Sequence, residues 1–419
     1  MNNEFKQQLQ EREFAILKDK QRVILKWATG CGKSKMAIDL INHATKDRLQ
    51  KSGLHHICER VLFVVAERAH IQNWEDEFNK WKLDRANIST DICCYASLKK
   101  YKDFSYDIVV LDEGHHVFSE KRMAALEDLK DNLMPWARIY LLSATLSSGK
   151  EDLITGVLGK FYTSTVTLKD AIRNDILPDP RIYVIGMELD NSKTDQELRV
   201  NKADDGSPVV EWEKRSKYLY KNLPCIIKCT EKQKYIYYTD TMEYWKRRYE
   251  LSHNQFQHNL WVNTGSVRKR YLGELKTSVV YKLIQKIKNK RYVCFCASVN
   301  QAEMLSSHNT ISSKKSSKYN QHIIDSFNEK KISNIYAVGM ITEGMNLNGI
   351  EIGVIAQLDG KERLFVQKAG RVLRADDPIA FICYYKDTQD EVYLKNALDN
   401  IDEKYVQHIN INQLNAIKL

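Results

Sequence analysis

The chain has 419 residues, enough for two or three domains of about 150 residues each, and it is not a small disulfide-stapled module. Hydrophobic residues make up 43% of it and charged residues 28%, as in an ordinary soluble protein, and no apolar run of about 18 residues indicates a membrane span. With 64 basic and 54 acidic residues the formal net charge is +10, which favours a polyanionic partner without requiring one.

The first residues, MNNEFKQQLQERE, are polar and lack an apolar centre, so we expect no secretory signal there. The nine cysteines are scattered along the chain. Cys93 and Cys94 are adjacent and Cys294 alternates with Cys296, spacings that do not suit a zinc site. We therefore expect reduced thiols in an intracellular protein.

Short apolar runs alternate with amphipathic stretches in the first part of the chain. The runs RVILKWA, RVLFVVA, DICCYA, YDIVVLD and RIYLLSA are apolar on both faces, and patterns typical of helices, such as KSKMAIDLINHATK and AHIQNWEDEFNKW, lie between them. Buried strands separated by helices predict a parallel sheet covered on both faces. We therefore predict an α/β domain over residues 1–178, with the boundary near Pro178.

The second part of the chain begins with a strand, in DILPDPRIYVIGMEL, and then changes character. Residues 191–275 are polar, rich in tyrosine and mostly helical in period, so we predict a helical insertion there. The alternation resumes with RYVCFCAS, NIYAVGM, GVIAQL and AFICYYK, which predicts a second α/β unit over residues 179–419. Within it, we expect residues 307–320 to form a mobile loop.

The segment ATGCGKS, residues 28–34, follows a predicted strand and opens a predicted helix. Glycines at 30 and 32 let the backbone approach a phosphate closely, and the helix N-terminus favours an anion. Lys33 would reach the β and γ phosphates, and the Ser34 hydroxyl would bind Mg²⁺. The general P-loop pattern places a glycine six residues before the lysine, where this chain has Trp27. The alternative interpretation is an ordinary helix N-terminus that carries a lysine.

A strand ending in acidic residues supplies the second part of a nucleotide site. YDIVVLDEGHH ends in Asp112 and Glu113. An aspartate at this place can hold Mg²⁺, and the neighbouring glutamate can orient and deprotonate the attacking water. Alone, such a pair is a common solvated strand end, but together with the lysine loop it predicts ATP hydrolysis.

In order, ATGCGKS, DEGH, LLSAT and QKAGRVLR resemble the motif set of superfamily 2 helicases and nucleic-acid translocases, of the DEAD/DEAH kind. The first motif of this family has alanine-x-x-glycine-x-glycine-lysine and does not need the earlier glycine, which accounts for Trp27. The resemblance extends from Ala28 to Arg374. It implies two RecA-like domains, each a mainly parallel sheet flanked by helices, with ATP and Mg²⁺ as cofactors.

The resemblance also implies roles for individual residues. For ATP binding it implies Thr29, Gly30, Cys31, Gly32, Lys33 and Ser34, with Gln10 and Arg12 upstream as readers of the base. For catalysis it implies Lys33, Glu113, Gln367, Arg371 and Arg374; for magnesium, Ser34 and Asp112; for coupling to domain motion, Ser143, Thr145, Glu343 and Gly344. For contacts with the nucleic-acid backbone it implies Arg68, Ser97, Ser298 and Thr342.

The stretch NTGSVRKRYLGELK, with Arg268 and Arg270, could add contacts to nucleic acid. A solvated basic run on a helix surface is the alternative interpretation.

Three functions are compatible with these motifs. The first is an ATP-dependent DNA helicase, because EGMNL and QKAGRVLR resemble the motors of phage-encoded helicases and restriction-type translocases. The second is a duplex translocase that does not separate strands, because NWEDEF resembles Swi/Snf-type motors. The third is an ATP-gated nucleic-acid clamp. We expect DNA bound through phosphates, a cytoplasmic location in a bacterial or phage-infected cell, no membrane, and a protein partner from a replication, recombination or restriction machine.

Overall fold

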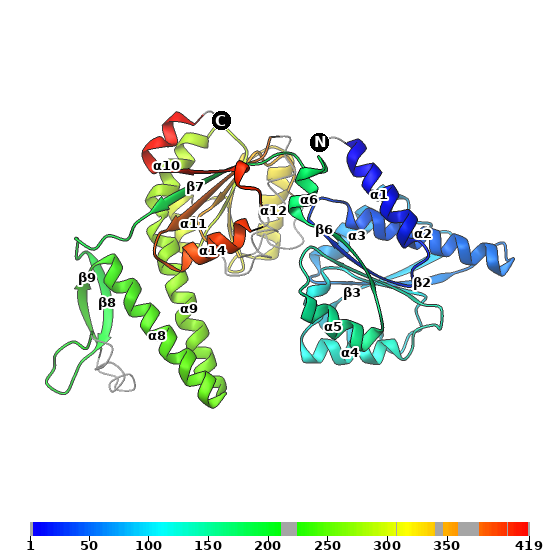
Figure 1. The fold of residues 1–419 in the computed structure, drawn as a ribbon, viewed down its shortest axis with the longest axis horizontal. Helices are drawn as coiled ribbons and strands as arrows, with labels where there is room; N and C mark the ends of the chain where they lie inside the picture. The colour runs from blue at the N-terminus through cyan, green and yellow to red at the C-terminus, as the bar shows by residue number, and fades with distance from the viewer. Residues whose placement is uncertain are drawn as a thin grey trace.

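The computed structural model describes residues 3–210, 224–306, 308–339, 347–358, 377–399 and 401–417. Two parallel sheets, each with helices on both faces, form two α/β units that follow each other along the chain (Figure 1). The predicted class is therefore confirmed. In the described part of the chain, no helix has the length and apolar character that crossing a membrane requires.

The first sheet has six strands in the order β3-β2-β4-β5-β1-β6, and every neighbouring pair is parallel. The strands of this unit are β1 (Arg22–Trp27), β2 (Glu59–Val65), β3 (Ile88–Cys94), β4 (Ile108–Leu111), β5 (Arg138–Ser143) and β6 (Tyr162–Val166). Its helices are α1 (Asn3–Leu17), α2 (Lys33–Ser52), α3 (Ala69–Trp81), η1 (Tyr95–Tyr101), η2 (Gly114–His116), α4 (Glu120–Lys130), α5 (Ser148–Leu158) and α6 (Leu168–Arg173).

Apolar side chains on both faces of this sheet determine which helices cover it. On one face, Phe63 and Val65 pack in a core with Trp74 and Phe78 of α3 and with apolar residues of α2. The opposite face packs against apolar residues of α4 and α5. Because all the strands are parallel, the loops that follow them meet at one edge of the sheet, which is the edge where α/β proteins bind their ligands.

The second sheet has seven strands in the order β11-β12-β10-β13-β14-β7-β15, again with parallel neighbours. Its strands are β7 (Arg181–Met187), β10 (Tyr292–Phe295), β11 (Thr310–Ser312), β12 (Asn334–Val338), β13 (Ile352–Ile355), β14 (Ile379–Tyr385) and β15 (Val406–Ile409). The helices around it are α10 (Thr277–Ile287), α11 (Val299–Leu305), α12 (Ser317–Asn328), α14 (Gln389–Leu398), η3 (Glu403–Tyr405) and η4 (Ile411–Ala416).

The insertion follows β7 and contains a long helical hairpin. It consists of an antiparallel ribbon, β8 (Gln196–Asn201) with β9 (Pro224–Cys229), and the helices α8 (Glu231–Ser252) and α9 (Gln255–Leu275). Figure 1 shows α8 and α9 side by side, extending away from the second sheet. The mostly helical character predicted for this segment is present, although the sequence pattern did not predict the ribbon.

Residues 167–180 connect the two sheets, because β6 ends at Val166 and β7 begins at Arg181. Pro178, where the sequence places the domain boundary, lies in this connection. An ion-pair clasp joins α6 to the C-terminal segment: Arg173 and Lys169 contact the Asp402 carboxylate at 2.9 Å and 2.8 Å.

The hydrogen bonds from Arg173 and Lys169 lower the pKa of Asp402 from an ordinary 3.8 to about 2. The clasp therefore stabilises the folded chain at pH values above the ordinary pKa of 3.8. This stabilisation is lost as the pH falls through about 2. We expect Asp402→Asn to lower the thermal midpoint at neutral pH, and we expect the difference from the parent to close between about pH 4 and pH 2. Scanning calorimetry across that range measures it. The matched control is Asp399→Asn, at an exposed position outside the clasp, which should match the parent throughout.

Candidate active site

The loop between β1 and α2 has the backbone of a phosphate-binding turn. Gly30 and Gly32 have φ angles of 97° and 94°, a left-handed conformation that only glycine adopts without strain. A Cβ atom on Gly32 would also lie 2.0 Å from Nε2 of Gln10. The loop delivers the chain into the N-terminus of α2, so unpaired amide groups and the helix dipole favour an anion here. Cys31 is fully buried in the core, so its backbone is the part of it available to the site.

Trp27, the residue at the position of the missing glycine, is a core residue. Its side chain is fully buried and its indole Nε1 donates to Oγ of Ser164 on β6 at 2.8 Å. Its backbone oxygen accepts a hydrogen bond from Nζ of Lys33 at 2.9 Å. Trp27 therefore anchors the loop to the sheet and holds the lysine at the end of β1.

Asp112 and Glu113 follow β4 at the same edge, separated from β1 by β5 alone. The Asp112 carboxylate accepts from Nε1 of Trp74 at 2.9 Å and from the Glu113 backbone N–H at 3.0 Å. Burial raises the pKa of Asp112, and the adjacent Glu113 carboxylate raises it further, while Lys33 acts in the opposite direction. Lys33 therefore lies close enough to Asp112 to interact with it electrostatically.

Glu113 is held in an unusual conformation. Its φ of 47° and ψ of 52° lie in the left-handed region, which is uncommon for residues other than glycine and is found at functional sites. The next residue, Gly114, packs so tightly that a Cβ atom there would lie 2.5 Å from Cγ of Leu141. The turn that aims Glu113 therefore depends on glycine at 114.

The residues present fit a magnesium ion. Hydroxyl and carboxylate oxygens, as in Ser34 and Asp112, are the ligands that Mg²⁺ prefers. Two neighbouring carboxylates, one with a raised pKa, form a site where a cation relieves both repulsion and desolvation.

His115 links the acidic pair to the turn after β5. Its Nδ1 lies 3.3 Å from Oε2 of Glu113 and 3.3 Å from Oγ of Ser143. The Ser143 hydroxyl donates to the Thr145 carbonyl at 3.1 Å and accepts from the Thr145 N–H. Since that hydroxyl has a single proton, we infer that His115 Nδ1 carries the hydrogen and donates it. One imidazole proton thus faces both the predicted base and the predicted coupling motif.

We expect His115→Ala to reduce ATP hydrolysis stimulated by nucleic acid more than basal ATP hydrolysis, because His115 contacts the predicted coupling motif as well as the predicted base. Losing one buried hydrogen bond costs about 0.5–1.5 kcal/mol, or about 2- to 10-fold in the stimulated rate. Steady-state ATPase assays with and without nucleic acid measure both rates. Replacing the neighbouring His116 in the same way is the matched control, and equal losses in the two variants would contradict the assignment.

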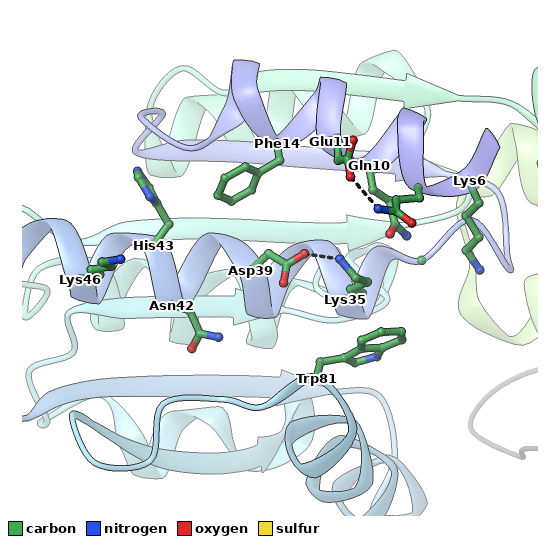
Figure 2. Close-up of a pocket in the computed structure, with 12 residues that line it drawn as sticks. Lys6, Gln10, Glu11, Phe14, Lys35, Asp39, Asn42, His43, Lys46 and Trp81 are labelled. Atoms are coloured by element: carbon green, nitrogen blue, oxygen red, sulfur yellow. Dashed lines mark hydrogen bonds and ion pairs between the residues drawn. The ribbon is translucent and has the colours of Figure 1, made fainter. Parts of the chain in front are cut away.

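A pocket of about 730 Å³ adjoins the phosphate loop between α1, α2 and the end of α3. Figure 2 shows Phe14 and Trp81 on either side of the pocket, with Lys35 and Asp39 of α2 between them. Lys35 pairs with Asp39 at 2.6 Å, and its Nζ lies 5.6 Å from the Trp81 ring centroid. An aromatic pocket with a few polar groups beside a phosphate loop has the character of a site for a nucleotide base.

Gln10 and Arg12, the two predicted base readers, lie in different environments. Gln10 is buried, lines the pocket and donates from Nε2 to the Cys31 carbonyl at 3.2 Å. The Arg12 side chain is 68% exposed, pairs with Glu13 at 3.0 Å and does not line the pocket. Gln10 therefore lies in the wall of the pocket and Arg12 lies outside it, and the base-reading role of each stays a prediction.

We expect Gln10→Ala to raise the KM for ATP about 3- to 10-fold with little change in kcat, because a contact that binds substrate and transition state equally affects KM alone. Arg12→Ala is the control and should leave both constants unchanged. ATPase titrations measure the two variants side by side. A larger effect at Arg12 than at Gln10 would reverse this interpretation of the pocket.

Of the residues predicted to contact nucleic acid, some lie at the protein surface and others are buried. Arg68 is exposed after β2, and Ser97, half-buried after β3, donates to the Cys94 carbonyl at 3.0 Å. Both lie at the edge of the first sheet that carries the phosphate loop. In the second unit Arg270 is exposed on α9, whereas Arg268 and Ser298 are buried.

The polar groups of Arg268 and Ser298 are used inside the protein, in contacts that the sequence pattern did not predict. The Arg268 guanidinium donates to Oε1 of Gln389 at 3.0 Å, and Ser298 caps α11 and donates to Oε1 of Glu274 at 2.7 Å. The predicted residues Thr342, Glu343, Gly344, Gln367, Arg371 and Arg374 lie outside the described residues.

The sequence motifs did not point to several residues that complete the site. Trp74 and His70 approach Asp112 from α3, and Lys6 donates from Nζ to the Gly30 carbonyl at 2.7 Å. The spacing of His70, Trp74 and Phe78 places all three on one face of α3. Only the order of β2 and β4 in the sheet reveals that this face meets Asp112.

Two family models match segments near the two ends of the chain. The family model described as type III restriction enzyme, res subunit, matches residues 2–103, and the one described as helicase conserved C-terminal domain matches residues 275–376. No curated protein matches the sequence.

Solved structures share the fold at low identity. S. cerevisiae Dbp5 bound to RNA and ADP BeF3 is 11% identical, with a TM-score of 0.60 over 97% of this chain and 90% of that one. The Pyrococcus furiosus Hef helicase domain is 12% identical, with a TM-score of 0.50 over 92% and 96% of the two chains. At these identities the likeness shows a shared fold of two tandem RecA-like units.

Proposed function

Because this chain is a superfamily 2 helicase and a nucleic-acid-dependent ATPase, we propose that it is a DNA helicase that couples ATP hydrolysis to translocation on DNA and to its unwinding or remodelling. The observation that carries the proposal is the convergence of Lys33, Glu113 and Ser143 at one edge of the first sheet. Lys33 would bind phosphate, Glu113 would activate water, and Ser143 would couple hydrolysis to domain motion.

In the proposed mechanism ATP lies with its base in the pocket beside Gln10 and its phosphates on the loop of residues 28–34. Lys33 leaves the Trp27 carbonyl and contacts the β and γ phosphates. Glu113 orients a water molecule and takes its proton as that water attacks the γ phosphorus. When bound by Ser34 and Asp112, Mg²⁺ supplies charge neutralisation at the phosphate oxygens.

We propose that the second unit completes the site. By resemblance, Arg371 and Arg374 would stabilise charge on the transferred phosphoryl group, with Gln367 in the same motif. An arginine used in this way contributes about 10³- to 10⁵-fold in rate. Since it comes from the second unit, hydrolysis would require the two units to close, and reopening would move them along the track. Thr342, Glu343 and Gly344 would lie at that closing interface.

DNA is the proposed track. The motif variants EGMNL and QKAGRVLR support it, as does the match to a restriction-enzyme subunit. The Dbp5 structure is bound to RNA, so RNA is the first competitor to test. Contacts mainly to phosphates would make binding independent of sequence and sensitive to salt.

We also propose domains at 1–178 and 179–419, a cytoplasmic location, and a partner in a replication, recombination or restriction machine.

A duplex translocase that does not separate strands is the second candidate. The NWEDEF stretch and the restriction-subunit match favour it. An ATP-gated clamp would combine slow ATPase activity with no strand displacement.

The test is steady-state ATPase activity of the purified chain alone and with single-stranded DNA, duplex DNA, forked DNA and RNA. Glu113→Gln serves as the blank. Stimulation by forked or single-stranded DNA, followed by strand displacement on a forked duplex, supports the helicase. Stimulation by duplex alone supports the translocase, and stimulation by RNA alone rejects DNA as the track.

A further inference from the structure

The tip of the α8–α9 hairpin exposes large apolar side chains. Leu251 at the end of α8 is 84% exposed, and Phe256 at the start of α9 is 63% exposed. The two residues flank the turn at 253–254, at the far end of the hairpin in Figure 1. Two large apolar side chains that flank one turn at the end of a projecting element form a candidate contact surface.

Aromatic rings support this tip from below. Tyr249 stacks on Trp261 with ring centroids 5.9 Å apart and an interplanar angle of 29°. His253 and His258 meet Tyr249 edge-on, at 5.8 Å and 4.9 Å. These ring contacts join α8 and α9 across the turn, so the two helices are packed together at the tip.

Basic residues lie beside the tip on α8. Lys246, Arg247 and Arg248 are consecutive and exposed, and Lys246 pairs with Glu250 at 3.7 Å. Within the described ranges no ion pair involves Arg247 or Arg248, which leaves two guanidinium groups facing solvent. An apolar and aromatic tip beside cationic side chains is complementary to stacked bases beside phosphates.

The root of the hairpin is fixed to the loop after β10. Ser298 donates to Oε1 of Glu274 at 2.7 Å, and Nε2 of Gln301 donates to the Gly273 carbonyl at 2.6 Å. A Cβ atom on Gly273 would lie 2.1 Å from Cβ of Ala297, so the two segments touch without space between them.

A buried ion pair adds to this attachment. Lys276, directly after α9, contacts Asp390 of α14 at 2.6 Å, and the side chains are 0% and 1% exposed. Arg268 joins the same helix through Gln389. Such contacts hold the hairpin and the second sheet together, so the tip would move with the second unit.

We propose that the tip formed by Leu251 and Phe256 meets the terminal base pair of a nucleic-acid duplex and acts as the wedge at which the strands part. This inference rests on the proposed motor function and names its strand-separating element. Phe256 would stack on the base exposed at the fork, and Leu251 would occupy the space that the partner base leaves. Arg247 and Arg248 would contact the backbone of one strand. Apolar wedges at unstacked base steps are an established device in proteins that distort duplexes.

The experiment compares the parent with the double variant Leu251→Ser, Phe256→Ser. The substrate is a forked DNA duplex with 2-aminopurine at the terminal base pair. Because both side chains are exposed, the variant should fold as the parent does, which thermal unfolding verifies. We expect its unwinding rate to fall about tenfold or more, the 2-aminopurine signal on binding to disappear, and ATPase stimulation by single-stranded DNA to stay within about twofold of the parent. The control is Leu153→Ser on α5, where the side chain is 59% exposed, and it should match the parent in all three measurements.

The outcomes separate the wedge from the motor. Unchanged unwinding in the double variant overturns the wedge and leaves the motor intact. Stimulated ATPase in a parent that gives neither unwinding nor a 2-aminopurine signal also overturns the wedge. No stimulation in the parent rejects the motor, and the 2-aminopurine signal then decides alone whether the tip meets a duplex end.

Discussion

Glu113→Gln is expected to lower ATP turnover by about 10²- to 10⁴-fold while ATP and nucleic acid still bind. Glutamine has the shape of glutamate but cannot accept the proton of the attacking water. In the structure, Glu113 occupies a left-handed conformation, and Gly114 packs tightly against Leu141 directly after it. The amide can occupy that conformation too, so the variant should stall with substrates bound.

Single-turnover hydrolysis and equilibrium binding of a labelled nucleotide measure the two halves of this expectation. Glu120→Gln, an exposed acid in the first turn of α4, is the matched control and should hydrolyse ATP at the parental rate. Turnover within about threefold of the parent in Glu113→Gln would contradict the role of general base. Loss of nucleotide binding would make Glu113 a structural residue.

Much of the fold follows from runs of apolar residues along the chain. RVILKWA, RVLFVVA and RIYLLSA become β1, β2 and β5, which are buried on both faces as the pattern predicts. A central parallel strand needs apolar residues at nearly every position, so its signal is strong. The same reasoning correctly predicted β7, β10, β12, β13 and β14.

The strands that the sequence pattern missed lie at sheet edges or in the insertion. β6 and β15 carry polar residues because an edge strand is only partly covered. β11 lies in residues 307–320, which we expected to form a mobile loop. Its three residues are fully covered by the chain around them, a burial that depends on pairing with β12, whose residues come later in the sequence.

Some residues of the site can be predicted from local sequence spacing, and others depend on packing between distant segments. Lys33, Asp112 and Glu113 are predictable because the chemistry fixes their spacing from a strand end. Trp74, Phe14 and Trp81 are not, because their place beside the site depends on how helices pack across several strands. The burial of Arg268 has the same origin, since a basic run does not reveal which of its members faces inward.

Lys33→Ala is expected to lower ATP turnover by about 10- to 150-fold. This range corresponds to the 1.5–3 kcal/mol of a hydrogen bond between charged groups. In the structure, Lys33 Nζ donates to the Trp27 carbonyl at the end of β1, so the ammonium is already close to where the phosphates would lie. Alanine removes the charge that compensates the γ phosphate, whereas the glycines that shape the loop are unchanged. Nucleotide affinity should therefore fall together with turnover.

Lys35→Ala provides the comparison that separates this role from a general loss of positive charge. Lys35 lies two residues further along α2, pairs with Asp39 and faces the base pocket. Removing it should alter the KM for ATP by a few fold and leave kcat near the parental value, because it acts on the base and not on the phosphates. If both variants lost turnover equally, the cause would be the folding of α2 or its overall charge. A large kcat effect confined to Lys33 would support the loop after β1 as the place where hydrolysis occurs.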